Sequence, residues 1–157
     1  MIGVKSFQDL DLQAKTVFMR LDLNCPLKGG EVSSDARIRA AIPTIKFALE
    51  SGAKLAVASH LGRPKGQVVP ELSLEPVGAR LSELLGTDVI LADNCVGDGV
   101  KGLLGNLRGG HVLLLENLRF HSGETKNDPE FARRLAEPFE VFVNDAFGAC
   151  HRSHASV

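Results

Sequence analysis

The sequence contains no tryptophan and no tyrosine, and only three of its 157 residues are cysteine. Without Trp or Tyr the chain has few aromatic faces on which RNA bases could stack, which argues against an RNA-binding module. The cysteines, Cys25, Cys95 and Cys150, are odd in number and widely spaced. They therefore argue against a disulfide framework, and free thiols are typical of a protein in the reducing cytoplasm.

Long apolar runs and an excess of charge of either sign are also absent. No segment approaches the ~18 consecutive apolar residues of a membrane span, and residues 1–5 lack the apolar stretch of a signal peptide. The net charge is −1, so no overall field attracts the chain to nucleic acid or to a membrane. With 44% hydrophobic and 24% charged residues, the sequence predicts one globular, cytoplasmic domain over residues 1–157.

Short, continuous apolar segments alternate with helical segments along the chain. The predicted strands are residues 16–21, 54–59, 88–92, 111–115 and 141–143, and the predicted helices are residues 35–51, 73–85, 97–107 and 128–137. Apolar strands separated by helices of ~10–15 residues are typical of a parallel sheet that is covered on both faces. We therefore expect a three-layer α/β/α fold with a mainly parallel, Rossmann-like sheet.

A charged residue in a strand, the residues before the first helix and a proline inside that helix each predict a local feature. Arg20 is the one charged residue of the first predicted strand, and we expect it to face a sheet edge. Ser33, Ser34 and Asp35 are predicted to cap the first helix. Pro43 removes a hydrogen bond from that helix, which predicts a kink or two abutting helical pieces.

The most informative stretch is the basic loop, Ser59–Gly66, which comes directly after the second predicted strand. It carries His60, Arg63 and Lys65, and two glycines and a proline interrupt any helix or strand there. In an open α/β sheet, ligands bind outside the carboxyl ends of the strands. The basic loop therefore predicts an anion site, although a solvated surface loop explains this stretch equally well when it is taken alone.

Polar residues also come after other predicted strands, and right-handed crossovers bring the carboxyl ends of those strands to the same edge. They are Asp22, Asn24 and Arg37 after the first strand, Arg119 and His121 after the fourth, and Asn144, Asp145, His151, Arg152 and His154 after the fifth. Arginine donates two parallel hydrogen bonds to a carboxylate or phosphate. Several arginines at one edge predict a small, multiply anionic ligand, whereas a surface ion pair would explain any single one of them.

Four separate motifs resemble the phosphoglycerate kinase family, in that family's order. They are the R-x-D-x-N-x-P pattern of Arg20–Leu27, then Ser59–Pro64, Leu115–Phe120, and Asn144–Gly148 with its continuation to Ser156. The resemblance runs to Val157 but covers only the N-terminal domain of this two-domain family. It implies a substrate-binding domain over residues 1–157, with the C-terminal nucleotide-binding domain absent from this chain.

The resemblance also implies an activity and a set of site residues. The activity is glycolytic phosphoryl transfer between 1,3-bisphosphoglycerate and ADP, which gives 3-phosphoglycerate and ATP. The residues implied to bind 3-phosphoglycerate are Asp22, Asn24, Arg37, His60, Arg63, Arg119 and Arg152. Arg37 is also implied to be catalytic, because it would neutralise charge on the phosphoryl group during transfer.

The same resemblance sets expectations for cofactors and partners. Mg-ATP or Mg-ADP is implied to bind to the missing C-terminal domain, which leaves this chain without a cofactor or metal site. The chain alone is therefore expected to bind the acid substrate and to be inactive. The intact enzyme is expected to be a cytoplasmic monomer that binds neither nucleic acid nor membrane.

Two alternatives remain open from the residues alone. Gly97–Gly102 spells G-x-G-x-x-G, and Glu116 lies beyond it at about the distance of a ribose-binding acid, as in a dinucleotide-binding Rossmann-like module. Residues 93–96 separate these glycines from the preceding strand, which weakens that interpretation. The second alternative is a non-catalytic anion-binding domain. No P-loop pattern and no second pair of zinc ligands is present, and Cys25 is expected to be a buried, inert thiol.

Overall fold

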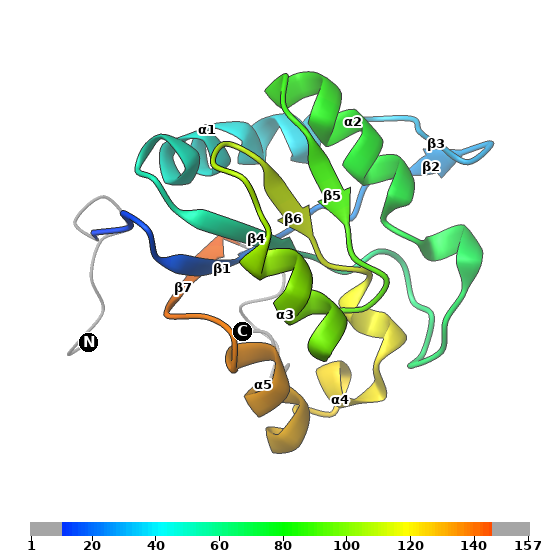
Figure 1. Ribbon diagram of the computed structural model, residues 1–157. Helices are drawn as coiled ribbons and strands as arrows, with labels where there is room; N and C mark the ends of the chain where they lie inside the picture. The colour runs from blue at the N-terminus through cyan, green and yellow to red at the C-terminus, as the bar shows by residue number, and fades with distance from the viewer. Residues whose placement is uncertain (1–10, 146–157) are drawn as a thin grey trace.

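The computed structural model describes residues 11–145, and its centre is a five-stranded sheet (Figure 1). The strands, in spatial order, are β5 (Val89–Leu91), β6 (Val112–Leu114), β4 (Lys54–Ala58), β1 (Thr16–Leu21) and β7 (Val141–Asp145). All neighbouring strands are parallel, and Val17 lies opposite both Leu55 and Val141. The predicted strands and their parallel arrangement are therefore confirmed.

Helices cover both faces of this sheet. Figure 1 shows α1 (Ala36–Glu50) and α2 (Glu75–Leu85) over one face, and α3 (Asp98–Gly105) and α5 (Pro129–Ala136) over the other. The remaining short elements are the antiparallel hairpin β2 (Leu27–Lys28) and β3 (Glu31–Val32), and the helices η2 (Pro70–Leu72), η3 (Leu118–Phe120) and α4 (Ser122–Thr125). Within residues 11–145 no helix has the length and apolar character needed to cross a membrane. The three-layer α/β/α prediction is confirmed.

The side chains of β1 alternate between two apolar clusters, one on each face of the sheet. Val17 and Met19 pack with Ile38 of α1 in the first cluster. Phe18 packs with Leu135 of α5 in the second. Because helices cover both faces, the strand is apolar on both sides apart from Arg20 and does not alternate between apolar and polar residues.

The helix ends confirm some sequence signals and contradict others. Asp128 caps α5, where its carboxylate accepts a hydrogen bond from the Glu130 amide. Ser73 Oγ accepts a hydrogen bond from the Glu75 amide (3.2 Å), but the residue at the cap position of α2 is Leu74 and not Ser73. Asp35 is the N-cap residue of α1, as predicted, but its carboxylate makes no cap hydrogen bond and instead pairs with Arg39 and Arg80. Pro43 lies inside α1, which is one continuous helix and not two abutting pieces.

The expectation for Arg20 is also wrong, because its side chain does not face a sheet edge. β1 lies between β4 and β7, and Arg20 is only 1% exposed. Its guanidinium meets the buried carboxylate of Glu124 in α4, where Nη2 lies 3.8 Å from Oε2. A buried strand can hold an arginine at this position because a carboxylate from a distant segment balances its charge.

Candidate functional site

A pocket of about 280 Å³ opens where β1 and β4 end. Its lining residues are Asp22, Asn24, Arg37, His60, Gly62, Arg63 and Arg119. Six of the seven residues predicted to bind an anion are among them, and they come after three different strands, β1, β4 and β6. The seventh, Arg152, lies outside the described residues.

The exit of β1 is tied to the basic loop by the side chain of Asn24. Its Oδ1 accepts a hydrogen bond from the amide of Gly62 (3.0 Å), and Asp22 Oδ1 accepts one from the amide of Asn24 (3.1 Å). Gly62 has a φ of +61°, and a Cβ there would lie 2.8 Å from Leu72 Cδ2. Glycine alone fits this turn without strain, and the turn holds Asp22 and Asn24 against the loop that carries Arg63.

Asn117, which its residue type does not mark as a ligand of an anion, joins the basic loop to the exit of β6. Its side chain is fully buried, and Oδ1 accepts hydrogen bonds from the amides of Leu61 (3.2 Å) and Arg119 (3.0 Å). Its Nδ2 donates to the carbonyls of Leu61 (2.8 Å) and Leu72 (2.9 Å). Every hydrogen-bonding site of this amide is used, so Asn117 fixes the backbone on two sides of the pocket. Its one sequence signal is its place in the third motif.

Positive charge predominates in the pocket. The guanidinium groups that line it belong to Arg37, Arg63 and Arg119, and the carboxylate belongs to Asp22. Asp22 pairs with Arg37. Burial alone would raise the pKa of Asp22, but hydrogen bonds from the Asn24 amide and from Arg37, with the charge of Arg37, hold it below its usual value. The surplus of guanidinium groups makes the pocket suitable for a small anion.

The described thiols take no part in this chemistry. Cys25 and Cys95 are both free and buried. Burial raises the pKa of both thiols above the ordinary value, and the thiolate is the reactive form. The prediction of a buried, inert Cys25 is therefore supported, whereas Cys150 lies outside the described residues.

The sequence profile described as "Phosphoglycerate kinase" matches residues 7–157. The chain belongs to the phosphoglycerate kinase family. The phosphoglycerate kinase of Anaeromyxobacter dehalogenans (strain 2CP-C) is 59% identical over 158 residues, and that of a Picosynechococcus species is 56% identical over 155. These alignments cover 99% and 98% of this chain but only 40% and 39% of the two relatives. The chain thus spans about 40% of the length of the curated relatives it matches.

Solved structures of phosphoglycerate kinases have the same fold. The enzyme from Coxiella burnetii superposes with a TM-score of 0.84 at 41% identity, over 96% of this chain and 37% of that one. The enzyme from Pyrococcus horikoshii OT3 gives 0.85 at 38% identity, over 96% of this chain and 38% of that one. The family resemblance of the sequence motifs is confirmed over nearly the whole chain.

Some polar residues predicted at this edge do not line the arginine-lined pocket. Lys65 and Asn144 are exposed and lie outside its lining. His121 stacks on Phe131, with ring centroids 4.9 Å apart, and its Nε2 donates to Asn94 Oδ1 (2.8 Å). Residues His151 and His154 fall outside the described part of the chain, as Arg152 does.

We expect part of the pH dependence of stability to come from His121. Burial, reinforced by the charge of Arg134, lowers the pKa of His121 below its ordinary value. The unfolded chain therefore takes up this proton first, and the stability associated with neutral His121 falls as the pH drops below about 6.5. Urea unfolding at several pH values should show that the free energy of unfolding falls more steeply with decreasing pH in the wild type than in His121→Gln. Parallel curves would contradict this assignment.

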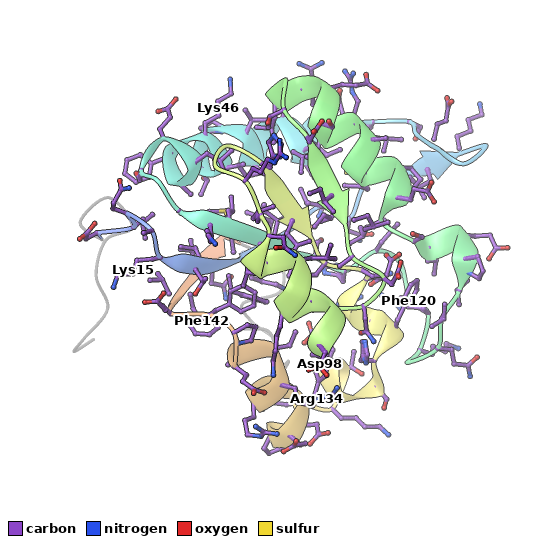
Figure 2. The ribbon with its side chains drawn as sticks, in the orientation of Figure 1. Lys15, Lys46, Asp98, Phe120, Arg134 and Phe142 are labelled. Carbon is purple, nitrogen blue, oxygen red and sulfur yellow. The ribbon has the colours of Figure 1, made fainter. Side chains whose placement is uncertain are left out.

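The glycine pattern at α3 does not form a dinucleotide site in this fold. Gly97 precedes α3 and lies six residues beyond the end of β5. A Cβ on Gly97 would lie 3.9 Å from Arg134 Nη2, and Figure 2 shows Arg134 beside Asp98 at the start of α3. Glu116, the expected ribose-binding acid, instead accepts a hydrogen bond from Ser73 Oγ (2.7 Å). Glu116 is thus engaged within the protein, and the glycines do not turn directly off the strand as a dinucleotide fingerprint does.

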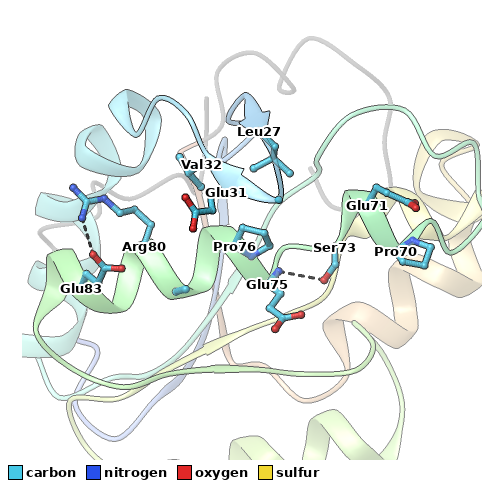
Figure 3. Close-up of a pocket in the computed structure, with 12 residues that line it drawn as sticks. Leu27, Glu31, Val32, Pro70, Glu71, Ser73, Glu75, Pro76, Arg80 and Glu83 are labelled. Carbon is cyan, nitrogen blue, oxygen red and sulfur yellow. Dashed lines mark hydrogen bonds and ion pairs between the residues drawn. The ribbon is translucent and has the colours of Figure 1, made fainter.

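A larger pocket of about 620 Å³ lies between the β2–β3 hairpin, η2 and α2 (Figure 3). Its charged lining residues are Glu31, Glu71, Glu75, Arg80 and Glu83. Arg80 is already bonded to Asp35 and Glu83. Because carboxylates predominate, this pocket disfavours an anion. The smaller, arginine-lined pocket is therefore the candidate site.

Proposed function

We propose that residues 1–157 form the N-terminal, 3-phosphoglycerate-binding domain of a phosphoglycerate kinase. The observation that carries this proposal is the meeting of Arg37, Arg63 and Arg119 around one small pocket. 3-Phosphoglycerate carries a carboxylate and a phosphate, and the planar fork of arginine matches both groups. In the proposed reaction the whole protein transfers a phosphoryl group between 1,3-bisphosphoglycerate and ADP in glycolysis, which gives 3-phosphoglycerate and ATP.

The remaining lining residues suit the uncharged part of this substrate. Ionised Asp22 can only accept hydrogen bonds, so we assign it to the substrate hydroxyl and not to either anionic end. Asn24 and His60 add polar groups that orient the acid. Arg152 joins this set on the family resemblance of the last motif.

Arg37 is the proposed catalytic residue. Its side chain is 52% exposed while it lines the pocket, so it can meet a second substrate that arrives from solvent. As the acyl-phosphate O–P bond breaks, an ADP oxygen forms the new bond to phosphorus and the substrate carboxylate leaves. Charge on the oxygens of the transferring group is then stabilised by a positioned guanidinium.

The magnesium nucleotide is proposed to bind to the part of the whole protein that this chain does not cover. Among residues 11–145 no group of three or more His, Cys, Asp or Glu side chains could hold a metal ion. When bound, Mg²⁺ neutralises charge on the nucleotide phosphates, and a pocket lined by guanidinium groups does not suit it. We propose that this chain alone binds the acid without turnover, and that the whole enzyme is a cytoplasmic monomer.

Replacing Arg63 with alanine should weaken 3-phosphoglycerate binding by about 1.5–3 kcal/mol, which is the range for hydrogen bonds to charged groups. This loss corresponds to roughly tenfold to a hundredfold in the dissociation constant. Isothermal titration calorimetry of the 157-residue chain measures it directly. Binding by the wild type should also weaken as salt is added, because Arg63 is exposed and screened.

Arg133→Ala is the matched control, because Arg133 is an exposed arginine on α5 that pairs with Glu130 outside the pocket. It should leave the affinity unchanged. An Arg63→Ala variant with wild-type affinity would place Arg63 outside the site. Thermal stabilisation by NAD but not by 3-phosphoglycerate would favour the dinucleotide alternative.

A further inference from the structure

A buried ion pair lies directly behind His60. Arg20 in β1 is 1% exposed and Glu124 in α4 is 0% exposed, with Nη2 of the arginine 3.8 Å from Oε2 of the glutamate. The same Nη2 lies 2.9 Å from Nδ1 of His60, and Nη1 donates to the Leu21 carbonyl (2.5 Å). His60 is 7% exposed and lines the anion pocket. The guanidinium thus connects the core to a residue of the site.

The chemistry of this contact determines the protonation of the imidazole. A guanidinium carries five N–H donors and has no acceptor. Nδ1 of His60 must therefore accept the hydrogen bond from Arg20, so it carries no proton. A neutral imidazole has a single N–H group, and in His60 that group is on Nε2.

We propose that Arg20, held in place by Glu124, is a positioning residue that fixes His60 as its neutral Nε2–H tautomer. His60 then offers the pocket an N–H donor and never a lone pair or a variable charge. This role adds a positioning residue to the proposed 3-phosphoglycerate site. It depends on the proposed function only for the identity of the anion. A donor attracts substrate oxygens, whereas an unprotonated Nε2 would repel them.

The surroundings of His60 explain why such a device is needed. Among residues 11–145, the charged groups near it include Arg20 on β1, Asp22 after β1, Arg37 on α1, Arg63 on its own loop, Arg119 on η3 and Glu124 on α4. A histidine among groups of both signs would otherwise change charge near neutral pH. A buried ion pair adds little net stability compared with a well-packed apolar pair. Stability alone therefore does not explain why Arg20 is buried here. Fixing the protonation of the neighbouring imidazole does give it a role.

The first test uses the wild-type chain without ligand. Long-range ¹H–¹⁵N correlation spectra of the imidazole nitrogens should show His60 with a protonated Nε2 and an unprotonated Nδ1. This pattern should persist from about pH 8 to below about pH 6.5, where an ordinary histidine is half protonated. A His60 with the proton on Nδ1, or one that titrates in this range, would overturn the proposal.

A second test uses Arg20→Met, with Arg39→Met on the exposed surface of α1 as the matched control. In Arg20→Met the His60 nitrogens should show both tautomers and should titrate, whereas Arg39→Met should give the wild-type pattern. An unchanged His60 pattern in Arg20→Met would contradict the inference.

The ratio of wild-type to Arg20→Met affinity for 3-phosphoglycerate should also vary with pH, and this ratio cancels the titration of the ligand's own phosphate. A constant ratio would count against the role of Arg20. The ligand-free spectra and the calorimetry are independent. The expected tautomer without 3-phosphoglycerate binding would therefore contradict the proposed function and not this inference.

Discussion

Replacing Asn117 with alanine is expected to lower the free energy of unfolding by about 3–5 kcal/mol. The substitution removes four hydrogen bonds from a side chain that is 0% exposed. It leaves the amides of Leu61 and Arg119 and the carbonyls of Leu61 and Leu72 without that partner. Each buried polar group that loses its partner costs about 1–3 kcal/mol, and water entering the gap recovers part of the sum. Urea unfolding followed by circular dichroism measures the loss.

Asn106→Ala is the matched control, because Asn106 is an exposed asparagine at the end of α3. It should change the free energy of unfolding by less than about 0.5 kcal/mol. Asn117→Asp keeps the shape of the side chain but replaces its two N–H donors with acceptors, and it should be at least as destabilising as alanine. A loss below about 1 kcal/mol for Asn117→Ala would show that its hydrogen bonds are readily replaced.

The parts of the fold that the sequence predicts are those governed by local pattern. β1 and β4 are buried on both faces, so each is a mostly apolar segment that can be recognised in the sequence as a short strand. The candidate site could also be predicted, because parallel strands bring the residues beyond their carboxyl ends to one edge of the sheet. Asp22, His60 and Arg119 lie far apart in the sequence, yet they line the same pocket.

The errors concern side chains that have a partner remote in the sequence. Asp35 has the residue type of a helix cap, but Arg80, 45 positions away, and Arg39 take its carboxylate. Arg20 is predicted at an edge because its partner Glu124 lies in α4, a helix of four residues that is too short to show a helical period. No local pattern contains such pairings, and only the folded chain reveals them.

Asn117 illustrates a further limit of sequence reasoning. Its motif position marks it, but the backbone groups it bonds belong to the basic loop and to η2, which approach it only after folding. The roles of the pocket residues stay predictions, and so does that of Arg152. The calorimetry of the Arg63 variant tests the role of Arg63.

Breaking the Arg20–Glu124 pair from either side should be the other large effect on stability. Arg20→Met leaves the Glu124 carboxylate buried without this counter-charge, and Glu124→Leu does the same to the guanidinium. Each single variant should lose about 3–5 kcal/mol of unfolding free energy, the range for a broken buried pair. The double variant removes both charges, so it should lose clearly less than the sum of the two.

The exposed Arg133–Glu130 pair provides the control for this double-mutant cycle. Its closest N–O distance is 2.7 Å, shorter than the 3.8 Å of the buried pair, but both of its side chains are 62% exposed. Its coupling energy should be only about 0.2–1 kcal/mol, because water screens the pair. If Arg20 and Glu124 were additive within about 0.5 kcal/mol, the carboxylate would not compensate the guanidinium. Arg20 would then lack the anchor that lets it hold the His60 imidazole.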